Sequence, residues 1–244
     1  MIDQTRELLY ARAVRVALFV TCLADTLQPA VGRATVAVLE RLGVEVVFPR
    51  EQTCCGQLHL NAGYPEVAEA LARRYVETFA EFEAVVVPSG SCAGHLRTHV
   101  REYAPGADDV ASRTWELSQF LVDRLGVLDV GSTFEGSLTY HPTCHSQRTL
   151  QLGDRPESLM RAAPGVELRV LTDATECCGF GGLFAIRNAD VSSAMLADKL
   201  KRIEESGADA VCACDASCLL HIGGGLERRS VPIRALHLAE VLAA

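Results

Sequence analysis

The tripeptide Cys-Cys-Gly occurs twice in this chain, at 54–56 and at 177–179. A single cysteine precedes each copy with 31 or 32 residues between, and another follows the pair after 37 or 40 positions. The copies are offset by 122 to 126 positions in a chain of 244 residues, which predicts an internal duplication. The first set is Cys22, Cys54, Cys55 and Cys92, and the second set is Cys144, Cys177, Cys178 and Cys218.

Composition indicates a globular chain with redox or metal chemistry. The net charge of −8 argues against nucleic acid or an anionic membrane as the main partner. The apolar run Val14–Thr21 is too short to span a bilayer and no small-residue cleavage site follows it, so we expect a cytoplasmic protein without an integral membrane segment. In a reducing compartment, ten cysteines favour metal binding over disulfides, which remain the alternative outside it.

Short β-branched runs alternate with longer helical patterns in both halves, which predicts an α/β fold. We expect two pseudo-symmetric lobes, each a small, mainly parallel sheet flanked by helices, with domains at 13–126 and 136–244. Residues 1–12 have the pattern of an added amphipathic helix. The expected strands are Val14–Val20, Val44–Phe48, Ala84–Val87, Arg113–Trp115, Ser137–Tyr140, Val166–Leu171, Asp209–Cys212 and a strand at Ile233. The expected helices are Pro29–Leu42, Pro65–Phe82, Leu117–Leu125, Pro156–Ala162, Ala189–Ser206 and Leu236–Leu242.

Each cysteine of the two sets follows a predicted strand. Parallel strands end at one edge of their sheet, so four thiols that are distant in the chain can converge there. Two adjacent cysteines do not easily chelate one tetrahedral zinc ion, whereas neighbouring thiolates can bind different irons of a cluster. The pattern therefore favours an iron-sulfur cluster in each half, with glycine allowing close backbone approach and helix amide ends facing the anionic group.

Several other residues and interpretations stay open. Cys212 and Cys214 have no partners in the first half, which favours a structural role. His141, His145 and Arg148 surround Cys144 and are candidates for binding a substrate carboxylate or donating hydrogen bonds to sulfur. A catalytic thiol with His145 as base is one alternative. A structural or scaffold module that holds zinc is another.

The motifs resemble those of the CCG-domain iron-sulfur oxidoreductases. This family includes the cysteine-rich component of heterodisulfide reductase and, closer to this chain, the lactate utilisation protein A group. The match covers nearly the whole chain. The motifs that carry it are the segments 54–57, 61–64, 88–94 and 177–182 and the Asp215-x-x-Cys218 element.

The resemblance implies a redox subunit of a multi-protein system that oxidises L-lactate to pyruvate. It implies two partners, a ferredoxin-type iron-sulfur protein and a third small subunit. In the heterodisulfide reductase type a Cys-x-x-Cys element supplies five thiols per half, but here Ser89 and Asp215 replace its first cysteine. Four thiols per half suit an ordinary [4Fe-4S] cluster. A cluster that uses Ser89, Asp215 or Cys214, zinc in one half, and a thiol/disulfide redox subunit of the heterodisulfide type remain alternatives.

Overall fold

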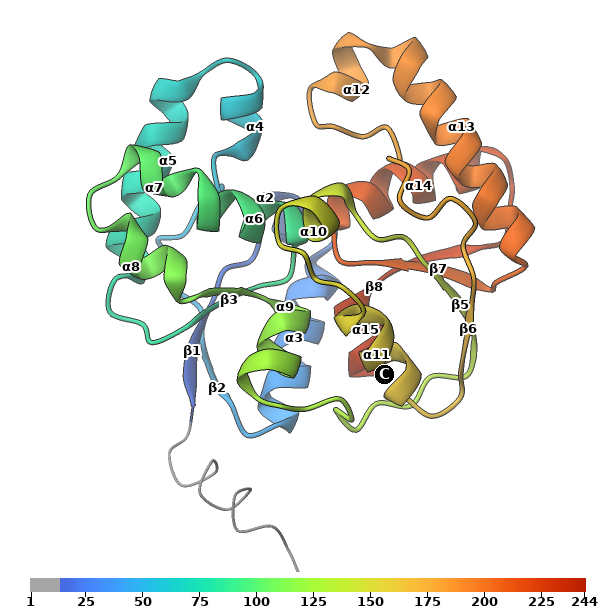
Figure 1. Ribbon diagram of the computed structural model, residues 1–244, viewed down its shortest axis with the longest axis horizontal. Helices are drawn as coiled ribbons and strands as arrows, with labels where there is room; N and C mark the ends of the chain where they lie inside the picture. The colour runs from blue at the N-terminus through green and yellow to red at the C-terminus, as the bar shows by residue number, and fades with distance from the viewer. Residues whose placement is uncertain (1–13) are drawn as a thin grey trace, which may run out of the picture.

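A computed structural model describes residues 14–244, and the helix predicted over residues 1–12 lies outside this range. Within it the chain forms two four-stranded parallel sheets with helices packed around them, which confirms the predicted α/β class (Figure 1). The strand order is β2-β1-β3-β4 in the first sheet and β6-β5-β7-β8 in the second. The identical order is the structural counterpart of the duplicated cysteine pattern.

The elements of the first repeat run from β1 to η1. Its strands are β1 (Arg15–Leu18), β2 (Glu45–Val47), β3 (Val85–Val87) and β4 (Thr114–Glu116). Its helices are α2 (Cys22–Leu27), α3 (Pro29–Arg41), α4 (Gln57–Asn61), α5 (Pro65–Phe79), α6 (Gly90–Thr98), α7 (Val100–Tyr103), α8 (Ala107–Ser112), α9 (Leu117–Gln119) and the π-helical turn η1 (Phe120–Arg124).

The second repeat follows the same plan. Its strands are β5 (Gly136–Tyr140), β6 (Val166–Arg169), β7 (Ala210–Ala213) and β8 (Arg234–His237). Its helices are α10 (Cys144–Arg148), α11 (Arg155–Ala162), α12 (Phe184–Arg187), α13 (Ala189–Ser206), α14 (Ala216–Arg228) and α15 (Leu238–Ala243). We call each sheet with its helices a lobe.

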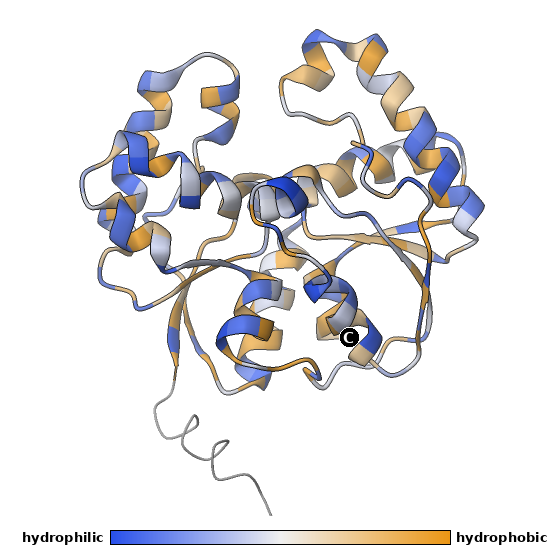
Figure 2. Cartoon of the chain, viewed as in Figure 1, coloured by the Kyte–Doolittle hydropathy of each residue, from blue (hydrophilic) through white to orange (hydrophobic). Residues whose placement is uncertain are grey.

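Local sequence explains why these elements form. The central strands β3 and β7 are completely buried, as expected for apolar runs in a sheet that is covered on both faces. Proline occupies the first turn of α3 and α5, where its missing N–H costs no hydrogen bond. Gly207 ends α13 in the left-handed conformation with φ of 63°. Figure 2 shows apolar residues along the strands and hydrophilic residues on the outer faces of the helices.

The two lobes are joined by a reciprocal exchange of terminal helices. The last helix of the chain, α15, packs on α3 of the first repeat, and α9 packs on α11 of the second repeat, in the lower centre of Figure 1. Arg41 at the end of α3 donates hydrogen bonds to the carbonyls of Leu242 and Ala243, at 3.2 and 2.7 Å. One apolar core therefore runs through both lobes. The predicted boundaries at 13–126 and 136–244 stay a prediction.

Most predicted elements appear within a few residues of their expected ends, with one correction. The helix expected from Leu236 begins at Leu238, because β8 continues to His237, which pairs with Ala213 of β7. Within residues 14–244, no helix combines the length and the apolar character that a membrane crossing requires.

Candidate metal and redox site

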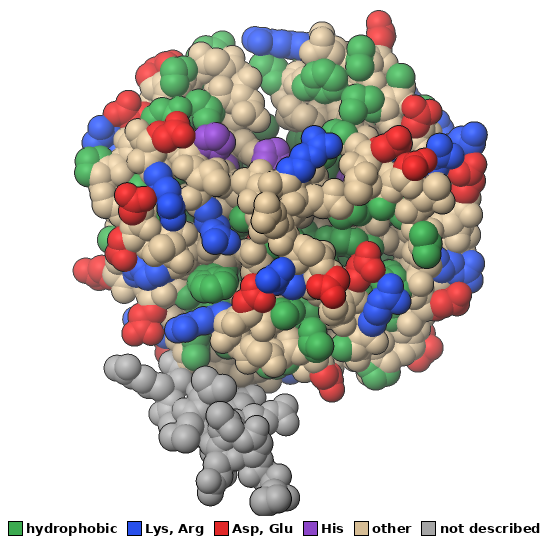
Figure 3. Space-filling model, in the orientation of Figure 1, with side chains coloured by type: hydrophobic (Ala, Val, Ile, Leu, Met, Phe, Trp, Pro, Cys, Tyr) green, Lys and Arg blue, Asp and Glu red, His purple; other side chains and the backbone are tan. Residues whose placement is uncertain are grey.

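All eight thiols of the two sets line one cavity between the lobes, with a volume of about 190 Å³. Cys22 and Cys144 are the first residues of α2 and α10, and Cys92 and Cys218 lie in the first turns of α6 and α14. The Cys-Cys pairs lie in loops after β2 and β6. The parallel topology thus brings together residues that are far apart in sequence, and Figure 3 shows the surface hollowed between the lobes, with histidine side chains close to the hollow.

The thiols within a set are close but not bonded. The Cys22 thiol lies 3.6 Å from Cys54 Sγ, and the Cys55 thiol lies 3.3 Å from Cys92 Sγ. A disulfide would need about 2.05 Å. All ten cysteines within residues 14–244 are free thiols, so both sets are available as ligands.

The Cys-Cys-Gly turn has the same geometry in both repeats. Gly56 and Gly179 have φ of +93° and +89°, a region that favours glycine. Their N–H groups donate to Cys54 Sγ at 3.4 Å and to Cys177 Sγ at 3.3 Å. A Cβ on Gly179 would lie only 2.6 Å from the Ser192 carbonyl oxygen. The glycine therefore permits both the turn and its close packing on α13.

These contacts make the first cysteine of each pair the one that ionises most readily. Hydrogen bonds from Cys22 and Cys55, together with the Gly56 N–H, lower the pKa of Cys54 to about 2. The corresponding contacts from Cys144, Cys178 and Gly179 lower the pKa of Cys177 to about 2. The pKa values of the thiols that donate to them are raised by the same hydrogen bonds and by burial; these thiols are Cys22, Cys55, Cys144 and Cys178.

The donor set fits a soft metal centre. Each set presents four thiols. The second cysteine of the Cys-Cys pair is buried, and the other three cysteines are partly exposed. The helices α6 and α14 begin at the site and direct N–H groups toward negative charge there. Soft thiolates select zinc or iron-sulfur centres, so the cysteine groups are suited to a metal or an iron-sulfur cluster.

A buried hydrogen-bond network joins the lobes between the two sets. The Asp215 carboxylate, at the N-cap of α14, accepts from Ser89 Oγ at 2.6 Å and from Ser91 N and Oγ at 3.0 and 2.8 Å. Its second oxygen accepts from the Thr143 hydroxyl. Ser89 is the N-cap of α6 and accepts from Cys92 N at 3.2 Å. The two residues that replace the missing cysteines thus bond to each other across the lobe boundary.

The three candidate residues around Cys144 occupy different places. His145 lines the cavity, and its Nε2 lies 3.0 Å from Gln57 Nε2 of the other lobe. His141 is buried behind the second set and Arg148 is exposed, and neither lines the cavity. Cys212 and Cys214 are buried outside the cavity, and the Cys214 Sγ lies 3.3 Å from the Tyr140 hydroxyl.

The sequence prediction missed a matched pair of histidines. His95 and His221 follow Cys92 and Cys218 by three positions, so they share the offset of 126. His95 Nε2 lies 3.6 Å from where a Cβ on Gly56 would be. His221 Nε2 lies 3.3 Å from Ser192 Oγ, which donates to the Gly179 carbonyl at 2.8 Å. Each histidine thus lies next to the Cys-Cys-Gly turn of its own lobe. A comparison of the two repeats at residues other than cysteine would have found this pair.

Comparison with known proteins places the sequence of this chain in one family. The family described as CCG, cysteine-rich domain, matches residues 16–97 and again residues 138–223. A relative from Exiguobacterium named lactate utilization protein A is 46% identical, over 93% of this chain and 96% of its own length. Proteins of the same name from Geobacillus kaustophilus and Bacillus pumilus are 45% and 43% identical, each over 94% of this chain.

Solved structures match at much lower similarity. An aspartate racemase homologue from Pyrococcus horikoshii aligns over 94% of this chain and 96% of its own, with a TM-score of 0.35 and 11% identity.

Proposed function

Because the chain belongs to the cysteine-rich CCG domain family, as its two matched regions and its relatives show, we propose that it is an iron-sulfur redox subunit of a system that oxidises L-lactate to pyruvate. The observation that carries the proposal is the convergence of two sets of four thiols on one interlobe cavity. The names of the relatives support the lactate assignment.

In this proposal each set holds one cluster of the [4Fe-4S] type, with all four cysteines as ligands. When bound, such clusters supply one-electron transfer. The chain supplies the thiolates, and the N–H groups of Gly56 and Gly179 donate to the sulfur of the first cysteine of each pair. The partly buried cavity limits the access of water to both sets, which influences their reduction potentials.

The cavity also offers polar groups for a small carboxylate. His145 and Gln57 approach each other from opposite lobes at its wall, and Ser91 and Asn61 line it as well. A two-electron oxidation needs an exit for electrons, and we propose a ferredoxin-type partner and a third small subunit in the cytoplasm for that purpose. His145 is the candidate for binding substrate, whereas Arg148 is exposed outside the cavity.

Zinc in the second set is the alternative that one observation favours. His141, Cys178 and Cys218 each offer one ligand atom, and these three atoms lie within 4.8 Å of one another. Mixed cysteine and histidine ligands are common for zinc. Metal and sulfide analysis of anaerobically purified protein separates the two occupants, because a zinc site contains no inorganic sulfide.

Replacing one ligand of either set should remove iron from that set only. We expect about eight iron atoms per chain in the wild type and about half as many in Cys54→Ser or Cys177→Ser, because each set binds its own four-iron cluster. The measurement is iron and acid-labile sulfide per chain, with visible absorbance.

The control is Cys212→Ala, which changes a buried cysteine outside the cavity and should keep full iron. Full iron in both serine variants would refute the ligand assignment.

Lactate oxidation should require the partner proteins. In the presence of an artificial electron acceptor, we expect the loaded chain alone to form no pyruvate from L-lactate beyond a single turnover, because the route from its clusters to that acceptor runs through the partners. Co-purified with the ferredoxin-type and third subunits and given the same acceptor, it should turn over continuously, and D-lactate serves as the stereochemical control. Sustained pyruvate formation by the chain alone would contradict the relay role.

A further inference from the structure

The two metal sites have different surroundings, despite their matching cysteines. His141 precedes Cys144 by three positions, and Phe19 stands at the same place before Cys22. Phe19 is buried against aromatic rings of α5, with its centroid 5.6 Å from that of Tyr75. A polar imidazole in the second lobe thus corresponds to an apolar ring in the first.

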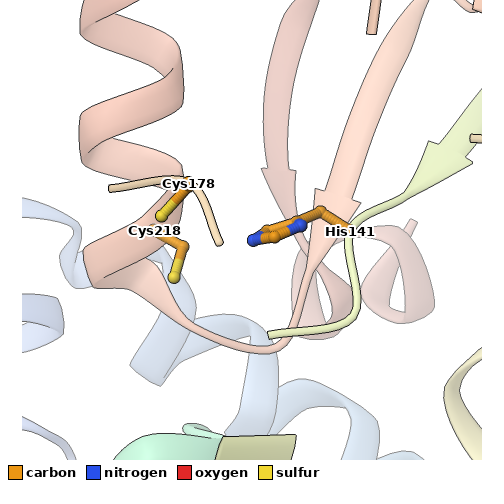
Figure 4. A group of neighbouring side chains, drawn as sticks. All are labelled: His141, Cys178 and Cys218. Carbon is orange, nitrogen blue, oxygen red and sulfur yellow. The ribbon is translucent and has the colours of Figure 1, made fainter. Parts of the chain in front are cut away.

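His141 is buried without a hydrogen-bond partner. Its side chain is 0% exposed, and neither ring nitrogen makes a hydrogen bond of good geometry with the residues that the structure describes, although the ring lies near the backbone of Ala174. Figure 4 shows the ring pointing toward the thiols of Cys178 and Cys218. A buried polar group without a well-formed hydrogen bond costs free energy. A centre bound to these thiols would provide the missing partner for the imidazole.

A buried lysine adds positive charge to the same lobe. Lys199 of α13 is 1% exposed, and its Nζ donates to the carbonyls of Asp173 and Ala174 at 3.1 and 3.2 Å, in the loop that leads to Cys177. Burial lowers the pKa of its ammonium, while the carboxylate of Glu176 and the second-set thiols oppose that shift. Glu176 is exposed, so solvent screens its charge more strongly than that of Lys199.

The first lobe contains a weaker counterpart. His59 of α4 lies near Cys54, but its side chain is only partly buried. His95 and His221 occupy corresponding places in the two lobes, but His95 is 2% exposed whereas His221 is partly exposed. Burial lowers the pKa of His95 to about 4, so its imidazole adds no positive charge to the first lobe at neutral pH. In α5, the helix that corresponds to α13, Tyr75 packs against Phe19 and its hydroxyl lies 2.6 Å from Thr114 Oγ1. The buried positive charge is therefore specific to the second lobe.

We infer that the second site has the higher reduction potential and receives electrons from the first, because Lys199 and His141 stabilise added negative charge there. The inference rests on the proposed iron-sulfur function of both sets. A nearby cation and N–H donors to sulfur favour the reduced form of such a centre, whereas apolar rings do not. The duplicated sites would then form a directional pair.

The test is a redox titration of the anaerobically loaded full chain, followed by electron paramagnetic resonance. The wild type should show two transitions, and the higher one should disappear in Cys177→Ser and persist in Cys54→Ser. Lys199→Met should lower the reduced-to-oxidised ratio of the second site at least tenfold at a fixed potential, which corresponds to about 59 mV for one electron. The first site should change less than twofold.

Lys199→Arg keeps the charge and should restore the wild-type ratio, which separates electrostatics from packing. His141→Phe copies the first lobe and should lower the same transition. Equal potentials in a fully iron-loaded wild type, or a higher transition that belongs to the first set, would overturn this inference alone. A wild type without iron would instead overturn the proposed function.

Discussion

Asp215→Ala should lower the free energy of unfolding by about 4 kcal/mol, measured by urea denaturation under anaerobic conditions. The carboxylate is 1% exposed and accepts hydrogen bonds from Ser89, Ser91 and Thr143. Removing it takes a shared acceptor from these three residues, and a buried donor that loses its acceptor costs roughly 1 to 3 kcal/mol.

Asp209→Ala is the matched control. Asp209 also accepts from a backbone N–H and a hydroxyl, both of Ser137 at 2.9 and 2.6 Å, but it is exposed. Its loss should destabilise the chain much less, because water can solvate the freed donors. A similar effect of both substitutions would mean that the interlobe network adds no special stability.

This network also positions the helices that carry one cysteine of each set. Ser89 and Asp215 are the N-cap residues of α6 and α14, and their side chains bond to each other. The first turns of these helices carry Cys92 and Cys218. The Asp215 carboxylate thus ties the start of α14 to the start of α6, so Asp215→Ala should also disturb the cavity between the lobes.

Sequence alone predicted the parts of the structure that local patterns encode. Alternating β-branched and amphipathic segments specified parallel sheets, and parallel sheets place the residue after each strand at one edge. The positions of Cys22, Cys92 and their repeats followed from that rule. The register of β1 with β2 and β3 then brought the first set together.

Contacts between the repeats were beyond such reasoning. No local pattern shows that α15 packs on α3, or that Arg41 binds carbonyls at the opposite end of the chain. The bond from Ser89 to Asp215 spans 126 positions and depends on how the lobes dock. In the sequence, Ser89 and Asp215 look like two independent replacements of a cysteine ligand. Only the folded chain shows that their side chains form a hydrogen bond with each other.

One pH-dependent contribution to stability should come from Glu116, the N-cap of α9. Burial raises the pKa of this carboxyl from 4.5 to about 7, despite hydrogen bonds from Ser118 and Gln119 that lower it. Above pH 4.5 the unfolded chain ionises Glu116, whereas the folded chain keeps the proton until about pH 7. The contribution of Glu116 to stability should therefore fall between these pH values by about 3 kcal/mol and stay level above pH 7. Burial lowers the pKa values of His95 and His141 to about 4, so these two groups contribute in the opposite direction, and the Glu116 contribution is isolated by comparison with a variant.

Glu116→Gln removes the titration but keeps an acceptor for the Ser118 and Gln119 N–H groups. We expect the free energy of unfolding of the variant to increase relative to that of the wild type as pH rises from 4.5 to 7. At pH 8 the variant should be more stable by about 3 kcal/mol. Urea denaturation across this range measures the difference. Glu157→Gln, which changes an exposed carboxylate 3.2 Å from Arg161, should alter stability by less than about 0.5 kcal/mol throughout. A Glu116→Gln curve parallel to that of the wild type would show that the buried carboxyl does not control this pH range.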